Sequence, residues 1–398
     1  LQSGALKDLD IEPQESKKIL IPVEKFEMLP FNEYFLDIEF RLKKKKGLLP
    51  KGYLIAWEQL PLINFNTIKL EFDLNISQEN YPKLNDVTET DNQIVITGKD
   101  FEIIFSKQTA TMDSWTFQGK NILLRGPKPN FWRTPTDNDF GNDMPKRMAV
   151  WKHATDEAQV NEIKVDNYDT SVGIEVFYNF PSVESMGSIL YVIYGDGRIL
   201  VYNKFEIGKG TLPNIPKVGI SMQIPKEFDA MTWFGRGPHE NYLDRKSSAK
   251  VDIYSGKVSD QFHPYVRPQE SGNKTDVRWA TFRNVAGDGL LVRGLLSLNA
   301  SHYLQEDYDH GFGEIKSGAT GNIKTTKQQR HSIDMVEREL INLDIDLIQM
   351  GLGGEDSWWA QPLEKYQIKP KNYDYSFTLM PIKSDENPVE LNKNAFLK

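Results

Sequence analysis

Apolar and polar residues alternate along much of the chain. From residue 34 to residue 42 every second side chain is apolar, which is the pattern of a half-buried β-strand. Residues 18–23 and 52–57 are its predicted partner strands. Residues 75–90 are polar and follow no regular period, so we expect a linker there. The pattern therefore divides the chain into residues 1–74, a linker at 75–90 and a long remainder at 91–398.

Beyond the linker the strand pattern continues almost to the end of the chain. The segments predicted as strands include 93–97, 101–106, 172–178, 188–194, 199–206, 218–224, 290–293, 340–347 and 373–379. Asp196-Gly197 and Gly287-Asp288-Gly289 are typical of hairpin turns, and residues 144–154 are the best candidate for a helix. About fifteen strands in some 300 residues predict an all-β fold with a large antiparallel β-sandwich.

The first 74 residues hold only three or four predicted strands. A complete immunoglobulin-like sandwich takes about seven strands and ~100 residues, so we predict a truncated one. The run of lysines at 43–46 indicates an exposed turn rather than a binding patch. The chain opens at Leu1 without an initiator methionine, and we expect it to be a fragment whose upstream part is missing.

Composition excludes several classes of function. The formal net charge is −8 and the pI is about 5.5, which argues against a nucleic-acid partner because such proteins need a basic footprint. No apolar run approaches the ~20 residues of a membrane span. The absence of cysteine excludes disulfides, thiolate nucleophiles and Cys-based zinc sites. The compartment stays open between periplasm and cytoplasm.

One glycine-rich loop indicates sugar recognition. Residues 350–359 read MGLGGEDSWW, with two adjacent indoles, Trp358 and Trp359, after the glycines and two acids. Glycines allow a tight turn, and the C–H faces of sugars stack on aromatic rings while their hydroxyls bind polar groups. Carbohydrate binding is therefore the first functional hypothesis.

Residues 131–141 form a second candidate loop. Asp137, Asn138 and Asp139 can ligate a hard cation or hold sugar hydroxyls. The same cluster can instead cap a turn or pair with Arg133.

Two further loops combine acids, amides and histidine. His239 beside Glu240 can transfer protons, although Arg236 and Glu240 can equally form a buried structural pair. In the loop at 263–279, Glu270 and Asn273 face either a ligand or the protein interior. His310 and His331 have no companion at metal-ligand spacing, so no metal site is predicted.

Four motifs in these loops occur in a fixed order. They are Arg133-x-Pro135-x-Asp137-Asn138-Asp139-x-Gly141, Gly235-Arg236-Gly237-Pro238-His239-Glu240-Asn241-Tyr242-x-Asp244-Arg245, Arg267-Pro268-Gln269-Glu270-x-Gly272-Asn273-x-Thr275-Asp276-Val277-Arg278-Trp279 and Met350-Gly351-x-Gly353-Gly354-x-Asp356-Ser357-Trp358. Over residues 91–385 the chain closely resembles the C-terminal domain of the large β-galactosidases of glycoside hydrolase family 2. The preceding residues, through 56–59, resemble the latter half of an immunoglobulin-like domain.

The resemblance implies a large sandwich of the galactose-mutarotase type, one of several domains of a retaining enzyme that hydrolyses terminal β-D-galactosides. In that family two catalytic glutamates lie in a TIM barrel, and this chain has no barrel-like βα alternation. We therefore expect no catalytic residue, no cofactor and no activity in this chain alone. Its expected partners are a galactoside, the missing N-terminal and barrel domains, which would hold any Mg or Na, and further subunits of a homo-oligomer.

The resemblance also assigns roles to residues. Trp358 is expected to stack on the sugar, with Trp359 as the alternative because a small residue is common there; Glu355 likewise replaces a common aspartate. The segment 141–147 is expected to border the pocket and to move. The other expected substrate contacts are Asp137, Asn138, Asp139 and Gly141. The expected structural residues are Arg133, Arg236, His239, Glu240, Asn241, Arg267, Glu270, Asn273 and Asp356.

Two rival functions stay open at this point. A stand-alone carbohydrate-binding module would use Trp358 or Trp359 without a barrel. An aldose epimerase of the mutarotase type would use His239 and Glu240.

Overall fold

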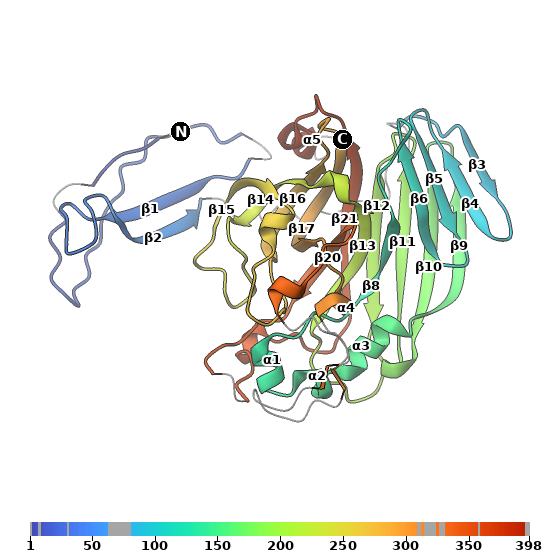
Figure 1. The fold of residues 1–398 in the computed structure, drawn as a ribbon. Coiled ribbons are helices and arrows are strands. Elements are labelled where there is room, and N and C mark those ends of the chain that lie inside the picture. The colour runs from blue at the N-terminus through green and yellow to red at the C-terminus, as the bar shows by residue number, and fades with distance from the viewer. Residues whose placement is uncertain are drawn as a thin grey trace. The chain divides into compact units, whose positions relative to one another are not determined.

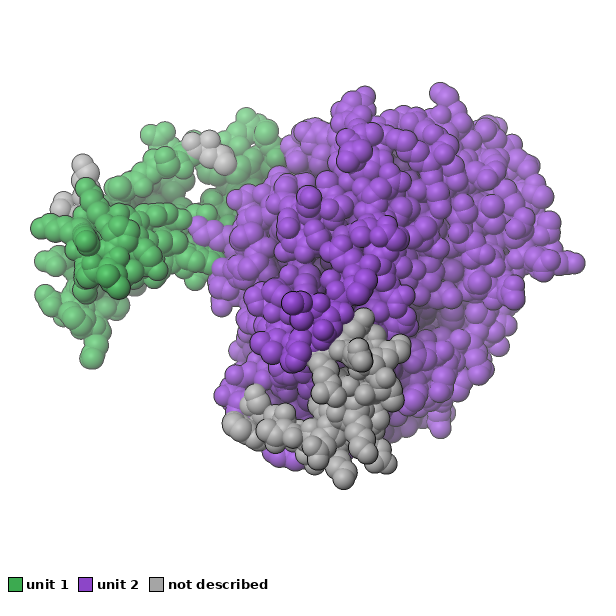
Figure 2. All heavy atoms as spheres, in the orientation of Figure 1, with its two compact units in different colours: residues 1–69, 397 green, residues 70–396, 398 purple. Residues whose placement is uncertain are grey.

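Two compact units make up the chain, Leu1–Lys69 and Leu70–Phe396 (Figure 2). The computed structural model describes residues 2–6, 9–29, 32–62, 81–308, 312–313, 324–325, 331–356 and 359–394. Each unit is treated by itself below.

The first unit contains one antiparallel pair, β1 (Phe35–Arg41) and β2 (Leu54–Pro61), with Phe35 opposite Pro61. The predicted strands at 34–42 and 52–57 are confirmed by this pair, and residues 43–46 lie in its connection as predicted. The predicted strand at 18–23 is wrong, since this segment pairs with no strand and Leu20 is 90% exposed. The immunoglobulin-like character of this part stays a prediction.

The second unit is built on a twelve-stranded sheet that is antiparallel throughout its pairings. Its path runs β15-β14-β16-β17-β21-β12-β11-β10-β9, while β13 joins β8 to β20 and β20 pairs with β17. The bounds are β8 (Arg125–Asn130), β9 (Gln159–Asn167), β10 (Ser171–Phe180), β11 (Ser185–Tyr194), β12 (Ile199–Glu206), β13 (Lys217–Pro225), β14 (Ala230–Gly237), β15 (Lys250–Lys257), β16 (Lys274–Arg283), β17 (Gly289–Ser301), β20 (Leu340–Gln349) and β21 (Tyr373–Ile382). The predicted all-β fold is confirmed.

A five-stranded sheet lies beside β10 and β11 (Figure 1). It comprises β3 (Asp86–Glu89), β4 (Gln93–Thr97), β5 (Phe101–Ser106), β6 (Thr111–Phe117) and β7 (Lys120–Asn121). Phe105 of β5 meets Tyr191 of β11 edge to face, with ring centroids 5.5 Å apart, inside one continuous apolar core. The prediction of a linker at 75–90 is wrong for residues 86–89, because β3 occupies them and partly buries Val87 against that core.

Short helices gather at one end of the large sheet (Figure 1). They are α1 (Asp137–Gly141), α2 (Met144–Arg147) and α3 (Ala149–Asp156). Later in the chain come α4 (Gln305–Tyr308), the short strand pair β18 (Phe312–Gly313) and β19 (Lys324–Thr325), and α5 (Pro388–Asn394). The predicted helix at 144–154 is present but divided at Met148, whose φ of −115° and ψ of 11° are not helical. None of the helices in the described ranges is long and apolar enough to cross a membrane.

Both predicted hairpin turns are confirmed. Asp196-Gly197 connects β11 to β12, and residues 287–289 connect β16 to β17. Gly197 and Gly287 have φ of 87° and 88°, a region that favours glycine.

Candidate carbohydrate-binding loop junction

Arg133 is a fully buried cation that joins two loops far apart in sequence. Its Nη2 donates to both carboxylate oxygens of Asp139 at 2.9 Å, and neither side chain is exposed. Its Nη1 donates to the carbonyl of Met350 at 2.6 Å and its Nη2 to that of Gly351 at 3.2 Å. Asp139 also accepts from the amide of Thr136 at 2.9 Å and so caps α1. The start of the glycine-rich loop is therefore fixed to the start of α1.

Asp244 holds the next part of the glycine-rich loop. Its two carboxylate oxygens accept from the amides of Leu352, at 3.0 Å, and Gly353, at 2.8 Å. Gly353 and Gly354 have φ of 71° and 117°, which other residues rarely adopt. An added Cβ at Gly354 would lie 3.2 Å from Nδ2 of Asn138, which itself donates to the Leu352 carbonyl at 3.4 Å. The loop thus lies directly against the predicted Asp-Asn-Asp motif.

Trp359 is the indole of this loop that the structure describes. It has a positive φ of 62°, is 67% exposed, and donates its amide to the carbonyl of Gly141 at 3.0 Å. Asn142 donates from Nδ2 to the Ala360 carbonyl at 3.3 Å. The segment predicted to move, 141–147, therefore contacts the tryptophan loop, while Trp358 lies outside the described residues.

Asp137 links α1 to the loop of the third motif. Its amide donates to Oε1 of Gln269 at 3.0 Å, and Nε2 of Gln269 donates back to its carboxylate at 3.1 Å. Arg267 lies 3.6 Å from the same carboxylate and 3.7 Å from the ring centre of Phe140. The Asp137 side chain is 54% exposed, so it is held in place and still open to a ligand.

Asn241 and Asn273 join the second and third motifs by exchanging backbone and side-chain bonds. The Asn241 amide donates to the Asn273 carbonyl at 2.8 Å, and Nδ2 of Asn273 donates to the Asn241 carbonyl at 2.9 Å. Oδ1 of Asn241 accepts from both the amide and the hydroxyl of Thr275, at 2.8 and 2.6 Å. Both asparagines are fully buried and their side chains have hydrogen-bond partners, as is usual for buried amides.

Glu240 is a structural acceptor at this junction. One carboxylate oxygen accepts from Arg245 and from the hydroxyl of Tyr265, and the other accepts from the amide of Gly272 at 2.8 Å. The pair between Arg236 and Glu240 considered from the sequence does not form. Arg236 instead donates from Nε to Asp276 at 2.5 Å.

His239 and Glu240, the pair considered for proton transfer, make contacts with different residues. Nε2 of His239 lies 3.0 Å from the hydroxyl of Ser248 on an exposed surface, whereas Glu240 is turned toward Tyr265 and Arg245. Neighbours in sequence point in different directions here, so the pair is not assembled for catalysis.

Glu270 belongs to a buried ionic cluster behind the junction. It accepts from Nδ2 of Asn299 at 2.9 Å, and burial raises its pKa above the usual range while Lys217 opposes the shift. Lys217, with no exposed surface, lies 2.8 Å from Asp344 and 3.4 Å from Asp346. Burial also raises the pKa of Asp346 well above its usual value. These groups are buried and interact mainly with one another, so they are not available to a ligand.

We call the described residues 136–142, 240–245, 265–273, 350–356 and 359–360, together with Arg133, the loop junction. It brings together all four motifs that the sequence analysis singled out. The expectation that Asp139 contacts substrate does not fit its complete burial and its ion pair. Asp137, Asn138, Gly141 and Trp359 stay candidates.

Sequence reasoning missed two residues that organise the junction, Asp244 and Gln269. Both stand inside the quoted motifs, yet nothing in their spacing shows that they bind loops more than a hundred residues away. Asp356, predicted as structural, accepts from the amide of Ala360 at 3.3 Å. Within the described ranges no three His, Asp or Glu residues gather as a metal site would require; His310 lies outside those ranges and His331 is exposed near the carbonyl of Val266.

Comparison with known proteins places the chain in a family. The model of the β-galactosidase small chain matches residues 97–379, and that of β-galactosidase domain 4 matches residues 1–63. The chain belongs to the β-galactosidase small-chain family. The resemblance predicted from the four motifs is thereby confirmed.

Relatives of this family are similar over most of the chain. A β-galactosidase of Priestia megaterium is 33% identical over 88% of this chain and 32% of that protein. One of Streptococcus thermophilus is 27% identical over 94% of this chain and 34% of that protein. The chain thus spans about a third of the length of the curated relatives that it matches.

Solved structures show weaker likeness. An aldose epimerase homologue from C. elegans has a TM-score of 0.40 and 8% identity, covering 75% of this chain and all of that one. A galactose 1-epimerase from Lactobacillus acidophilus has a TM-score of 0.35 and 8% identity, covering 76% of this chain and 98% of that one. Such scores give no information on ligand or activity.

Proposed function

We propose that the chain is part of a β-galactosidase and that its loop junction forms one wall of a galactoside pocket. The catalytic glutamates would come from the part of the relatives' length that this chain does not span. They would hydrolyse terminal β-D-galactosides with retention, one as acid/base and the other as nucleophile. The chain alone would then have no hydrolase activity.

The observation that carries this proposal is the way the tryptophan loop is held. A solvent-exposed indole, Trp359, follows a glycine-rich segment whose residues 350–353 are held by the buried Arg133 and the half-buried Asp244. Ordering a flexible loop on binding costs affinity, so a loop ordered in advance suits recognition. We assign stacking on the sugar to Trp358 and keep Trp359 as the alternative.

Polar groups beside the indole complete the wall. Asp137 has an exposed carboxylate fixed by Gln269, and Asn138 lies against Gly354. These groups can bind sugar hydroxyls while an indole covers a C–H face. No metal or cofactor is assigned to this wall.

Activity with and without the remaining part of the parent protein tests the proposal. The chain alone should not release nitrophenol from 4-nitrophenyl β-D-galactoside, and mixing it with the purified remainder of its parent should produce turnover. Trp358→Ala should then lower kcat/KM at least tenfold, with Trp359→Ala as the matched variant. Turnover by the chain alone would refute the proposal, and an effect at Trp359 only would move the stacking role there.

Binding by the isolated chain separates the rival module. A carbohydrate-binding module should bind galactosides with dissociation constants well below millimolar in calorimetry, whereas an incomplete wall should show little heat. The epimerase alternative predicts faster mutarotation of fresh α-galactose and loss of that effect in Glu240→Gln. The bonds that occupy Glu240 argue against it.

A further inference from the structure

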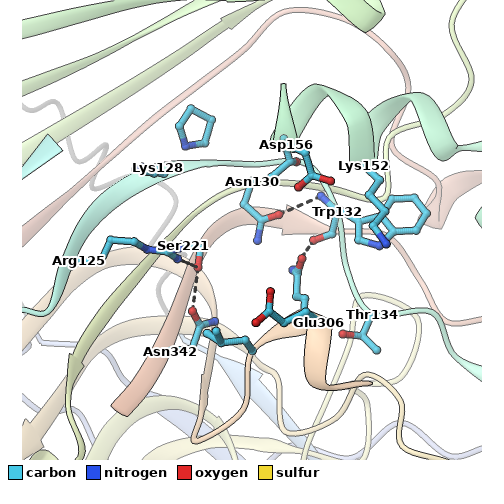
Figure 3. A pocket seen from close by; sticks show the side chains of 14 residues that line it. Arg125, Lys128, Asn130, Trp132, Thr134, Lys152, Asp156, Ser221, Glu306 and Asn342 are labelled. Carbon is cyan, nitrogen blue, oxygen red and sulfur yellow. Dashed lines mark hydrogen bonds between the residues drawn. The ribbon is translucent and has the colours of Figure 1, made fainter. Parts of the chain in front are cut away.

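A cavity of about 340 Å³ opens on the large sheet, within the second unit (Figure 3). Its floor is formed by β8, β13 and β20, and its walls by residues 132–134, the C-terminal end of α3 and the start of α4. None of its lining residues belongs to the loop junction. Neither the family models nor the proposed function gives this cavity a role.

Two cations line one end of the cavity, and both are incompletely paired. Arg125 donates from Nη2 to the hydroxyl of Ser221 at 3.2 Å, while its Nε is buried without a hydrogen-bond partner. Lys128 lies opposite Ser221 in the β8–β13 register, and within the described residues its ammonium makes no hydrogen bond or ion pair. Neither cation forms a salt bridge in the part of the chain that the structure describes, so this end of the cavity is suited to an anion.

The electrostatics of this end agree with the geometry. Burial lowers the pKa of Arg125, and burial together with the positive charge of Arg125 lowers the pKa of Lys128. At Arg125 burial outweighs the attraction of Asp344 and Glu306, and at Lys128 burial and Arg125 together outweigh the attraction of Asp113. An incoming carboxylate or phosphate would supply further negative charge through charge-assisted bonds, for which a guanidinium has matching geometry.

The rest of the lining is mostly polar and includes one further cation, Lys152, and two carboxylates, Asp156 and Glu306. Ser221 donates to Oδ1 of Asn342 at 3.0 Å, and the connected row Arg125–Ser221–Asn342 is visible along the floor (Figure 3). Nε2 of Gln305 donates to the Trp132 carbonyl at 2.7 Å and so ties α4 to the opposite wall. Fixed amides and hydroxyls of this kind orient a ligand with several hydroxyl groups.

We propose that this cavity binds a small polyhydroxylated acid, a monosaccharide carrying one carboxylate or one phosphate, with its acidic group on Arg125 and Lys128. The volume lies at the lower end of the range for ligand sites, so one sugar fits rather than an oligosaccharide. A neutral sugar would bring no negative charge to these two cations. The inference does not depend on the proposed galactosidase role.

Calorimetry on the full chain with four probes tests this inference. Galacturonate and galactose 6-phosphate represent the two sources of acid, while galactose and inorganic phosphate separate the two parts of the ligand. At least one acidic sugar should bind about tenfold or more tightly than both galactose and phosphate, since a charge-assisted bond is worth that much. Equal affinity for galactose, affinity for phosphate matching that of galactose 6-phosphate, or no binding at millimolar concentration would overturn the proposal.

Variants locate the bound probe. Lys128→Met should weaken binding of the better acidic sugar about tenfold. The matched control is Lys164→Met, which removes a half-exposed strand lysine paired with Glu162 at 3.4 Å and should bind as the unchanged chain does. Arg125→Gln should weaken binding further, and if it unfolds the chain, Lys128→Met decides alone because that lysine makes no bond in the fold. Unchanged binding in Lys128→Met would overturn the assignment.

Discussion

Replacing Arg133 by methionine tests the central connection of the loop junction. The substitution keeps an unbranched side chain of similar length but removes the guanidinium. Asp139 would remain in a site with no exposure, with only the Thr136 cap to satisfy it. The carbonyls of Met350 and Gly351 would lose the donor that now lies 2.6 and 3.2 Å away.

The expected loss of stability follows from these bonds. Removing one partner of a buried ion pair costs about 3–5 kcal/mol, because the other charge stays buried without compensation. The two orphaned carbonyls act on the same region, so their contribution is not additive with that figure. Arg133→Met/Asp139→Leu removes both charges of this pair and should recover about half or more of the loss. Asp139→Asn keeps the shape of the side chain, and its loss of stability should lie between those of Arg133→Met and the double variant.

Urea unfolding followed by tryptophan fluorescence measures these free energies, and hydrogen exchange locates the effect. The amide of Trp359, which is bonded to the Gly141 carbonyl at 3.0 Å, should exchange faster in Arg133→Met than in the unchanged chain. A loss below about 1 kcal/mol would contradict the reasoning, since that is the range of exposed pairs. A double variant no more stable than the single one would show that the uncompensated charge is not the cause.

Three further predictions concern the same region. Asp244→Ala should accelerate amide exchange at Leu352 and Gly353, which lose their acceptor, while leaving β20 protected. If the two amides exchange as slowly as in the unchanged chain, Asp244 does not hold the loop. Gly354→Ala, at a φ of 117°, should cost at least about 1 kcal/mol in urea unfolding because a Cβ is strained there, and a neutral result would mean that the loop adapts freely. Burial lowers the pKa of Lys274 from its usual 10.5 to about 8. Between these pH values the unfolded chain therefore binds more protons than the folded chain. The free energy of unfolding should then rise with pH across that window, by about 3 kcal/mol. Lys274→Met should flatten that rise, which unfolding at pH 8 and pH 10 would reveal as a smaller difference.

Local patterns predicted the elements of the fold well. The alternation at 93–97 and 101–106 and the turns at Asp196-Gly197 and Gly287 depend on a few adjacent residues, and all are present. The failures depend on tertiary context. Residues 18–23 have strand-like composition, but Leu20 is exposed because no other element packs on it. Residues 86–89 are mostly polar, yet they form the edge strand β3, which pairs with β4.

The residues of the site could be predicted as motifs but not as contacts. An Asp-Asn-Asp run is equally suited to ligand and turn, and only the buried guanidinium of Arg133 shows that Asp139 faces inward while Asp137 faces outward. In the same way, Arg236 and Glu240 are only four positions apart, yet each pairs with a different residue. Partners of charged side chains are set by how loops meet, which a single sequence does not reveal.

The separation between Arg133 and Met350 has a consequence for how the chain is made. The two residues are 217 positions apart, and ribosomes add about 5–20 residues per second. For at least ten seconds or so, Arg133 and Asp139 emerge before the carbonyls that complete their site exist. During synthesis these charges must therefore stay hydrated, and the sheet end that carries them can close only after β20 has been made. Nascent chains stalled just before and just after residue 350 should accordingly differ in protease resistance around α1.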